Sequence, residues 1–420
     1  MSISIRMTKL IKKQTEKIIL GCENFLTNHL NLVKGKRLGL ITNPTGVDSH
    51  LNNLIDLFHE DPDIDLVALY GPEHGVRGNA QAGENVPFYR EKKYDLPVFS
   101  LYGQSMEHDT GMLGDMDEHM RSFDTVETGK VPEDSMIENV DVMVFDIQDI
   151  GTRIYTYIST LAYCMEVCAK NGIEFIVLDR PNPINGVIME GPLLEYPEFS
   201  SFVGLFPIPI RHAMTIGELA QLFNERFLRK KARLKVIPMI GWKRSMWYDQ
   251  TSLPWVSPSP NMPTLRTATV YPGQVFLEGT NISEGRGTAT PFEIFGAPWI
   301  DGQDLTKNLN RLNLQGVKFR ETRFTPSFSK FNGKLCNGAH ISVLNRNIFQ
   351  PFMTTLHVIK TVKDMYPEQF RFHAEYFDKI MGSSSIRHGI EKGIILNEII
   401  GEYSFQLEEF SDQRKSYLLY

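Results

Sequence analysis

The chain has 420 residues, 42% of them hydrophobic and 22% charged, and its formal net charge is −6 at pH 7. This length predicts two domains, and a mildly negative chain without a long Lys/Arg run is not expected to bind nucleic acid. No apolar stretch approaches the roughly 20 residues of a membrane-spanning helix, so no membrane span is expected.

The first 35 residues form an amphipathic pattern that predicts helix. Within them, Ile18-Ile-Leu-Gly-Cys22 superficially resembles a lipoprotein cleavage site. Glu16 and Lys17 interrupt the segment, however, and leave its apolar core much shorter than the ~7–15 residues of a signal peptide. The four cysteines are too few and too scattered for a disulfide framework, and Cys164 and Cys168, one helical turn apart, are expected in the core. We therefore expect a reducing compartment and, by default, a cytoplasmic protein.

The next segment predicts a β-loop-α-β unit. Residues 36–42 read as a buried strand and Asn43–Gly46 as the loop at its end. Helical spacing follows in Leu51, Leu54, Ile55 and Phe58. Residues 66–70 then predict a second strand, which should pair in parallel with the first, so that both loops leave from the same edge of the sheet.

Two ionisable side chains follow that second strand. The strand stops at Gly71-Pro72, and Glu73 and His74 come next, with Gly75 and Gly78 keeping the backbone open. Ligands of open α/β sheets bind outside the carboxyl ends of the strands. Glu73 and His74 are therefore candidates for acid/base chemistry, although a helix-capping Glu beside a surface His would give the same pattern.

Residues 79–139 are less regular, with a possible strand at 97–102. A polar region carries His108, Asp109, Asp115, Asp117, Glu118 and His119. No recognised metal-ligand spacing occurs among them, so we expect no metal and interpret the region as an acidic loop that could act as a lid.

Two further apolar runs, 141–146 and 174–179, each end in an aspartate followed by a polar loop. Asp146 and Asp179 should therefore join Glu73 at one edge of a parallel sheet. Farther along, Thr215 and Glu218 predict the capping box of a helix, and residues 234–238 predict another strand. The proline-rich segment 254–263 is interpreted as a boundary or a rigid loop.

Functional side chains and glycines gather again at 278–288. This segment is not a phosphate-binding loop, because Gly285 and Gly287 lack a third glycine and no P-loop motif occurs in the chain. Residues 300–420 alternate helices with apolar strands and are assigned to a second domain that supports or covers the cleft.

Taken together, these motifs resemble one bacterial family, long catalogued as a domain of unknown function and associated with exo-β-N-acetylmuramidases of the NamZ type. The resemblance covers about residues 20–420. It rests on Asn43-Pro-Thr-Gly46, Gly71-Pro-Glu-His-Gly75, Asp146-Ile-Gln-Asp-Ile-Gly-Thr-Arg-Ile-Tyr155, Asp179-Arg-Pro-Asn-Pro183, Ser257-Pro-Ser-Pro-Asn-Met-Pro263, Glu278-Gly-Thr-Asn281, Ser283-Glu-Gly-Arg-Gly-Thr288 and Gly296-Ala-Pro-Trp299.

This resemblance implies a Rossmann-like parallel-sheet domain, here residues 1–264, and a smaller α+β C-terminal domain, residues 265–420, with the active site in the cleft between them. It also implies a cell-wall-recycling glycosidase that needs no cofactor. Such an enzyme releases N-acetylmuramic acid from the non-reducing end of peptidoglycan fragments such as MurNAc-GlcNAc and muropeptides. Many relatives are exported, whereas this sequence shows no recognisable export signal.

The family's proposed catalytic residue corresponds to Glu73, which we expect to act as the acid, with His74 beside it. The second catalytic group is open between Asp146, Glu284 and Asp179, or is the substrate's own 2-acetamido group. The lactyl carboxylate of N-acetylmuramic acid needs a cation, for which Arg153, Arg180, Arg211 and Arg286 are candidates. Tyr155, Tyr157, Trp255 and Trp299 are candidates for stacking on the sugar. The remaining expected substrate-binding residues are Asn43, Arg77, Gln148, Asn182, His212, Asn261 and Asn281.

Two other functions fit the same pattern. A non-catalytic binder of cell-wall fragments would use the same cleft and arginines without turnover. A nucleotide-dependent Rossmann enzyme is disfavoured because the glycine fingerprints are missing. Retention or inversion of configuration depends on the separation of two carboxylates, which the sequence does not give.

Overall fold

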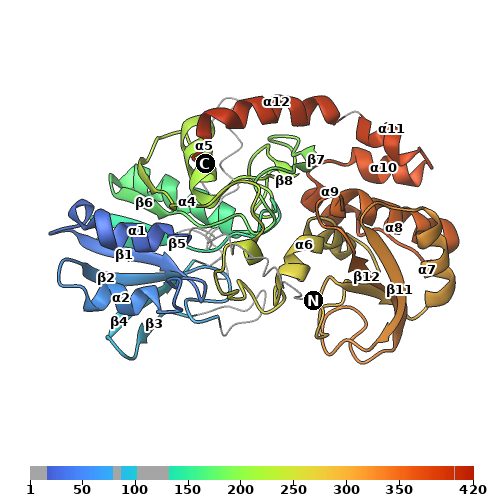
Figure 1. The fold of residues 1–420 in the computed structure, drawn as a ribbon, viewed down its shortest axis with the longest axis horizontal. Coiled ribbons are helices and arrows are strands. Elements are labelled where there is room, and N and C mark those ends of the chain that lie inside the picture. The colour runs from blue at the N-terminus through green and yellow to red at the C-terminus, as the bar shows by residue number, and fades with distance from the viewer. Residues whose placement is uncertain (1–16, 79–86, 102–131, 402) are drawn as a thin grey trace, which may run out of the picture.

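The computed structural model describes residues 17–78, 87–101, 132–401 and 403–420. They form an α/β protein with a mostly parallel seven-stranded sheet and a smaller C-terminal region built on an antiparallel sheet (Figure 1). The expected α/β class is therefore confirmed. The acidic segment 108–119 and the expected helical pattern before residue 17 lie outside the described residues.

The large sheet has the strand order β3-β4-β2-β1-β5-β6-β9. All neighbours pair in parallel except β3, which runs antiparallel to β4. The chain builds outward from β1 on one side and then from β5 on the other, so the order reverses between these two strands. The strands are β1 (Arg37–Thr42), β2 (Asp65–Gly71), β3 (Tyr89–Glu91), β4 (Leu96–Ser100), β5 (Val142–Asp146), β6 (Glu174–Leu178) and β9 (Arg233–Ile237).

Helices cover both faces of this sheet because side chains alternate along its buried strands. In β5, Val142 and Val144 pack in the cluster that contains α1 (Gly21–Asn28) and α2 (Leu54–Glu60). Met143 and Phe145 point to the opposite face, where α4 (Tyr157–Asn171) and α5 (Ile216–Arg226) pack. Short elements complete this half: η1 (Leu30–Leu32), α3 (Asp134–Ile137), η3 (Tyr248–Gln250) and a separate two-stranded sheet of β7 (Glu190–Leu193) and β8 (Pro209–Arg211).

Most local predictions for this half are confirmed. Strands occur where they are expected, at β1, β2, β4, β5, β6 and β9. The capping box is present, since Thr215 N donates to Glu218 Oε2 at 3.0 Å while Glu218 N donates to Thr215 Oγ1 at 3.3 Å. Cys164 and Cys168 are buried as predicted. The prediction for Leu51 is wrong: its φ is +66° and its side chain is 54% exposed, because Asn53 caps α2 and starts it at Leu54.

The C-terminal region is built on a three-stranded antiparallel sheet of order β10-β12-β11. Its strands are β10 (Ile294–Ala297), β11 (Val317–Phe324) and β12 (Cys336–Val343). The helices are α6 (Leu265–Gln274), η4 (Val275–Gly279), α7 (Gly302–Arg311), α8 (Pro351–Met365), α9 (Ala374–Met381), α10 (Ser385–Glu391), α11 (Leu396–Gly401), α12 (Ser404–Arg414) and η5 (Lys415–Tyr417). None of the helices within the described ranges is long and apolar enough to cross a membrane.

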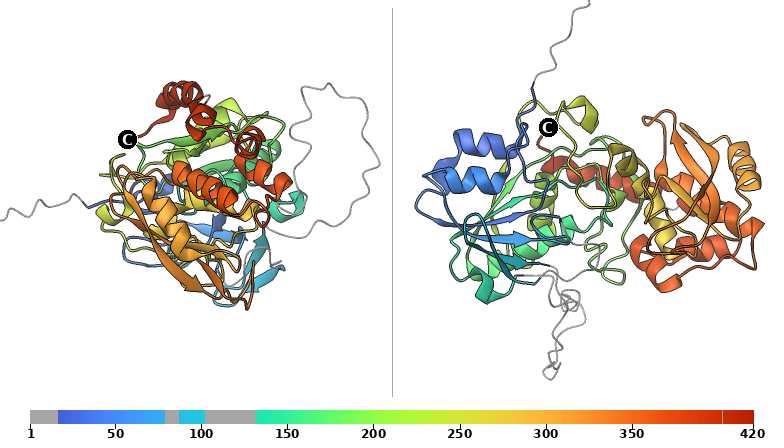
Figure 2. Two further views of the ribbon diagram at one scale, coloured as in Figure 1. Left: turned by 90° about the vertical axis from the view of Figure 1, so that its right-hand side faces the viewer. Right: turned by 90° about the horizontal axis from the view of Figure 1, so that it is seen from below.

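The two halves lie side by side but share one hydrophobic core (Figure 2). A single cluster includes Phe145 in β5, Tyr271 in α6 and Phe352 in α8. The chain also returns, since α12 runs from α11 back across both halves to α5 (Figure 1). There the Tyr420 hydroxyl donates to Asp179 Oδ2 at 2.7 Å and accepts from Met239 N at 2.8 Å. The last residue is therefore tied to the carboxyl edge of the large sheet.

This attachment predicts a stability effect for Tyr420→Phe. The change leaves the Met239 N–H without its acceptor and removes one donor from the buried Asp179, which costs about 1–3 kcal/mol. We expect a lower urea midpoint with an unchanged slope. Tyr94→Phe is the matched control, because its hydroxyl bonds at the surface to Glu60, at 3.2 Å. Equal midpoints for the two variants would contradict the attachment.

Candidate active site

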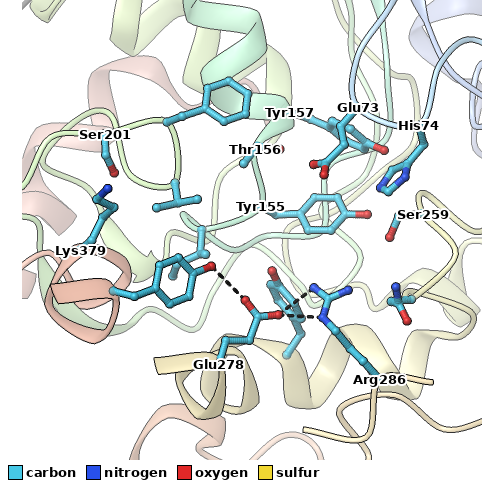
Figure 3. A pocket seen from close by; sticks show the side chains of 16 residues that line it. Glu73, His74, Tyr155, Thr156, Tyr157, Ser201, Ser259, Glu278, Arg286 and Lys379 are labelled. Atoms are coloured by element: carbon cyan, nitrogen blue, oxygen red, sulfur yellow. Dashed lines mark hydrogen bonds and ion pairs between the residues drawn. The ribbon is translucent and has the colours of Figure 1, made fainter. Parts of the chain in front are cut away.

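One cavity of about 400 Å³ draws its walls from both halves of the molecule. The loops after β2 and β5 form one side, and α6, η4, the loop after η4 and α9 form the other (Figure 3). Its size fits a small-molecule ligand such as one sugar unit. The lining residues are Glu73, His74, Ile154, Tyr155, Thr156, Tyr157, Ser201, Phe202, Val203, Ser259, Asn261, Tyr271, Glu278, Arg286, Tyr376 and Lys379.

A tight turn after β2 presents Glu73 to this cavity. Gly75 N donates to Pro72 O at 2.9 Å and closes the turn. His74 is buried and has a φ of +75°, a left-handed conformation that non-glycine residues seldom adopt. Backbone strain of this kind is retained where the surrounding structure enforces it, commonly at functional sites. The turn thus fixes the backbone position from which Glu73 enters the cavity.

Three buried tyrosines line the cavity together with Glu73. Tyr155 packs edge-on against Tyr157 at 5.0 Å and against Tyr271 at 5.7 Å between ring centroids. Burial raises the pKa of all three phenols, and the negative charge of Glu73 raises it further. The Tyr157 hydroxyl donates to Pro258 O at 2.5 Å, which ties the expected rigid loop, with Ser259 and Asn261, to this wall. The phenols therefore stay neutral and act as fixed polar groups.

A second carboxylate, Glu278, faces the cavity from η4. Its Oε1 accepts from Arg286 Nε at 2.9 Å and from Arg286 Nη2 at 2.7 Å, and its Oε2 accepts from the Tyr376 hydroxyl at 3.2 Å (Figure 3). Arg286 also stacks over Phe292 at 5.0 Å. Charge-assisted bonds of this kind hold Glu278 as an oriented anion.

Several expected catalytic or binding residues lie outside the lining of this cavity. Asp146 is fully buried in a two-pronged pair with Arg180, at 2.5 and 2.7 Å. Asp179 accepts from Thr215 Oγ1, Gly217 N and the Tyr420 hydroxyl, and burial, with Glu218 nearby, raises its pKa to about 7. Neither aspartate lines the cavity.

Glu284 is likewise held away from the cavity. Its Oε2 lies 3.1 Å from Lys330 Nζ, and its Oε1 lies 3.7 Å from Arg286 Nε. Lys330 also donates to the carbonyls of Leu277 and Ile282 at 2.7 and 3.0 Å. This cluster shapes the loop that carries Glu278 and Arg286.

The remaining expected residues divide in the same way. His74, Tyr155, Tyr157, Asn261 and Arg286 join Glu73 at the cavity. The other expected residues lie outside the cavity lining. Those with polar partners elsewhere in the fold are Asn43, Arg77, Gln148, Arg153, Asn182, Arg211, His212 and Asn281. Trp255 and Trp299 make ring contacts instead. Within the described ranges, no group of three or more His, Cys, Asp or Glu side chains could hold a metal ion.

Sequence reasoning missed several lining residues. Glu278 opens one of the motifs that carry the family resemblance, but from the sequence Glu284 is the expected catalytic residue of this segment. Tyr376 and Lys379 lie three residues apart on α9, where no local motif marks them. Only the docking of α9 brings them to the cavity.

Arg153 provides that docking. Its Nη1 donates to Pro192 O and Ile208 O, both at 3.0 Å, and its Nη2 donates to Ile380 O at 3.2 Å and Met381 O at 2.6 Å. The last two carbonyls end α9. Burial without a carboxylate lowers the pKa of this guanidinium to about 9. The side chain therefore braces α9 against the loop that carries Tyr155.

The comparisons with known proteins agree on one family. Residues 38–129 and 119–266 match the N-terminal model, and residues 269–420 the C-terminal model, of exo-β-N-acetylmuramidase NamZ. Peptidoglycan β-N-acetylmuramidase NamZ of Bacillus subtilis (strain 168) is 50% identical over 413 residues, covering 97% of this chain and 94% of that protein. Crystal structures of two DUF1343 family proteins from Bacteroides fragilis NCTC 9343 are similar, with 37% and 29% identity and TM-scores of 0.84 and 0.74. Each of the two matches covers 96% of this chain and 99% of the Bacteroides chain.

The brace predicts that Gly382→Ala is unusually costly. Gly382 ends α9 with a φ of +76°, and an added Cβ would lie 2.9 Å from Arg153 Nη2 and 3.0 Å from Leu194 Cα. Gly172→Ala is the matched control, since Gly172 ends α4 with a φ of +70° and has open space around it. We expect the control to lose about 1–2 kcal/mol from left-handed strain alone and Gly382→Ala to lose clearly more in urea unfolding. Equal losses would remove the evidence for a tight brace.

Proposed function

This chain belongs to the exo-β-N-acetylmuramidase NamZ family, and from that premise we propose how its cavity cleaves the glycosidic bond. The enzyme is a glycosidase that acts on peptidoglycan fragments and releases N-acetylmuramic acid from the non-reducing end. The order β4-β2-β1-β5-β6-β9 supports a Rossmann-like catalytic domain, since it places the reversal of strand order beside the loops that carry Glu73 and Tyr155. The cleft between this domain and the C-terminal region is the proposed active site.

Glu73 is the proposed general acid. The supporting observation is its position on a strained turn at the end of β2, pointing into a cavity among neutral phenols (Figure 3). Glycoside hydrolysis needs a proton on the leaving oxygen as the bond breaks. A carboxyl group fixed in direction and shielded by aromatic rings delivers that proton with little reorganisation.

Glu278 is the proposed second catalytic group, in place of Asp146 and Glu284. The bond-breaking step develops positive charge at the anomeric carbon. An anion held in place by Arg286 and Tyr376 stabilises that charge electrostatically. If the 2-acetamido oxygen of the substrate is the nucleophile, Glu278 stabilises the charged ring that it forms, so no separate protein nucleophile is required.

The proposed substrates are small saccharides such as MurNAc-GlcNAc and muropeptides. The cavity volume of about 400 Å³ supports one bound sugar unit, with the remainder of the fragment extending past Glu73. This arrangement agrees with exo-acting cleavage.

The acid assignment predicts the behaviour of Glu73→Gln. The amide keeps the shape of the side chain but cannot donate the catalytic proton, so we expect a loss of roughly 100-fold or more in kcat. The measurement is chromophore release from a β-linked N-acetylmuramic acid glycoside. Glu375→Gln, an exposed position on α9 outside the cavity lining, is the control and should match wild type. Full turnover by Glu73→Gln would assign the acid to another residue.

The electrostatic assignment predicts a loss for Glu278→Gln as well. Removal of the negative charge should lower kcat by roughly 100-fold, and Tyr376→Phe, which removes only one hydrogen bond to Glu278, should cost roughly tenfold. The same chromogenic assay measures both. An active Glu278→Gln enzyme with wild-type kcat would refute the assignment.

A further inference from the structure

One end of the cavity holds a cation and a hydroxyl for which the described part of the chain offers no partner. The Lys379 ammonium and the Ser201 hydroxyl point toward one another, away from Glu73 (Figure 3). Among the described residues, no carboxylate lies within 4 Å of Lys379 Nζ, and the buried Ser201 Oγ has no hydrogen-bond partner. A buried polar atom without a partner is costly, so such a pair indicates a place for a ligand.

Every arginine that the sequence offered for binding a carboxylate is already engaged. Arg286 holds Glu278, Arg180 holds Asp146 and Arg211 holds Glu190 at 2.8 Å. The terminal nitrogens of Arg153 donate hydrogen bonds to backbone carbonyls. Of these four, only Arg286 reaches the cavity, and its charge is balanced by Glu278. Lys379 is the remaining cation of the described lining.

The surrounding structure keeps Lys379 available. Its neighbour Asp378 is bound by Arg387 through two hydrogen bonds, at 2.9 and 2.7 Å, and therefore does not neutralise it. Tyr376 lies three residues earlier on the same helix and faces the same cavity. The Arg153 brace fixes the end of α9, so the position of the lysine relative to Tyr155 is set by the fold.

We propose that Lys379, assisted by Ser201, binds the lactyl carboxylate of N-acetylmuramic acid and thereby determines specificity for this sugar. This inference rests on the proposed function of the cavity. The lactyl group hangs from C3, two ring positions away from the anomeric carbon. The sites for the leaving oxygen and for the carboxylate must therefore lie on different sides of the ring, as Glu73 and Lys379 do in the cavity.

The assignment makes one chemical distinction. N-Acetylglucosamine lacks the lactyl group, and an amide-linked peptide or a lactamide replaces the negative charge with a neutral group. Each would leave the Lys379 ammonium without its anion. A hydrogen bond to a charged group is worth roughly 10- to 100-fold in affinity, so the free carboxylate should be preferred by that factor.

The test compares two chromogenic β-glycosides, N-acetylmuramic acid and its lactamide, with wild type, Lys379→Met, Lys379→Arg and Lys392→Met. We expect wild type to favour the free acid by roughly 10- to 100-fold in kcat/KM, mainly through KM. Lys379→Met should bring the ratio near one, and Lys379→Arg should restore part of it. Lys392, exposed after α10, is the matched control and should keep the wild-type ratio. An unchanged ratio in Lys379→Met would overturn the proposal.

Calorimetric binding of free N-acetylmuramic acid separates this inference from the proposed function. In one outcome, wild type binds the free sugar but shows no turnover, and Lys379→Met does not bind it. That outcome would support Lys379 as the carboxylate partner and reject the glycosidase assignment. Turnover that depends on Glu73, combined with equal affinity of wild type and Lys379→Met for the free sugar, would leave the glycosidase intact and reject the role of Lys379.

Discussion

The cavity depends on one buried cation that has no carboxylate partner. Removing a guanidinium from water is expensive, and burial lowers the pKa of Arg153 to about 9. That cost is offset only because carbonyls from three separate segments converge on it, including the end of α9. The helix that carries Tyr376 and Lys379 is thereby fixed to the loop that carries Tyr155. The shared hydrophobic core makes the same junction rigid, so the two halves act as one unit around the cavity.

Carboxylates at the ends of parallel strands serve two different purposes in this fold. Asp146 ends β5 and Asp179 directly follows β6, but their charges and hydrogen bonds hold Arg180, the start of α5 and Tyr420. Glu73 comes two residues after its strand, on a turn that lifts it away from the sheet edge. The residue that ends a strand is surrounded by loop backbones that need partners, whereas a residue on the following turn can face a ligand.

This distinction explains how much could be predicted from the sequence. Apolar runs and turn residues located the strands, the Thr215 capping box and Glu73, because those signals are local. The helical prediction for Leu51 is wrong because Asn53 caps α2 and the helix therefore begins at Leu54. Glu278 and Glu284 stand in one motif, and only the folded loop shows that Lys330 engages Glu284 while Arg286 orients Glu278. Tyr376 and Lys379 are beyond local reasoning, since their role depends on the contact between α9 and a loop more than 200 residues away in the chain.

The charges of the cavity also have a spatial order. Arg286 neutralises Glu278 within the protein, so this pair presents an oriented anion without adding net charge. Glu73, the proposed acid, lies at the other end of the cavity from Lys379 (Figure 3). Among the described lining residues, Lys379 is the lysine or arginine that has no carboxylate within 4 Å, and a substrate carboxylate would be its partner. A neutral sugar entering the same space would leave the ammonium partly desolvated and unpaired, which disfavours that sugar more strongly than the loss of a contact alone.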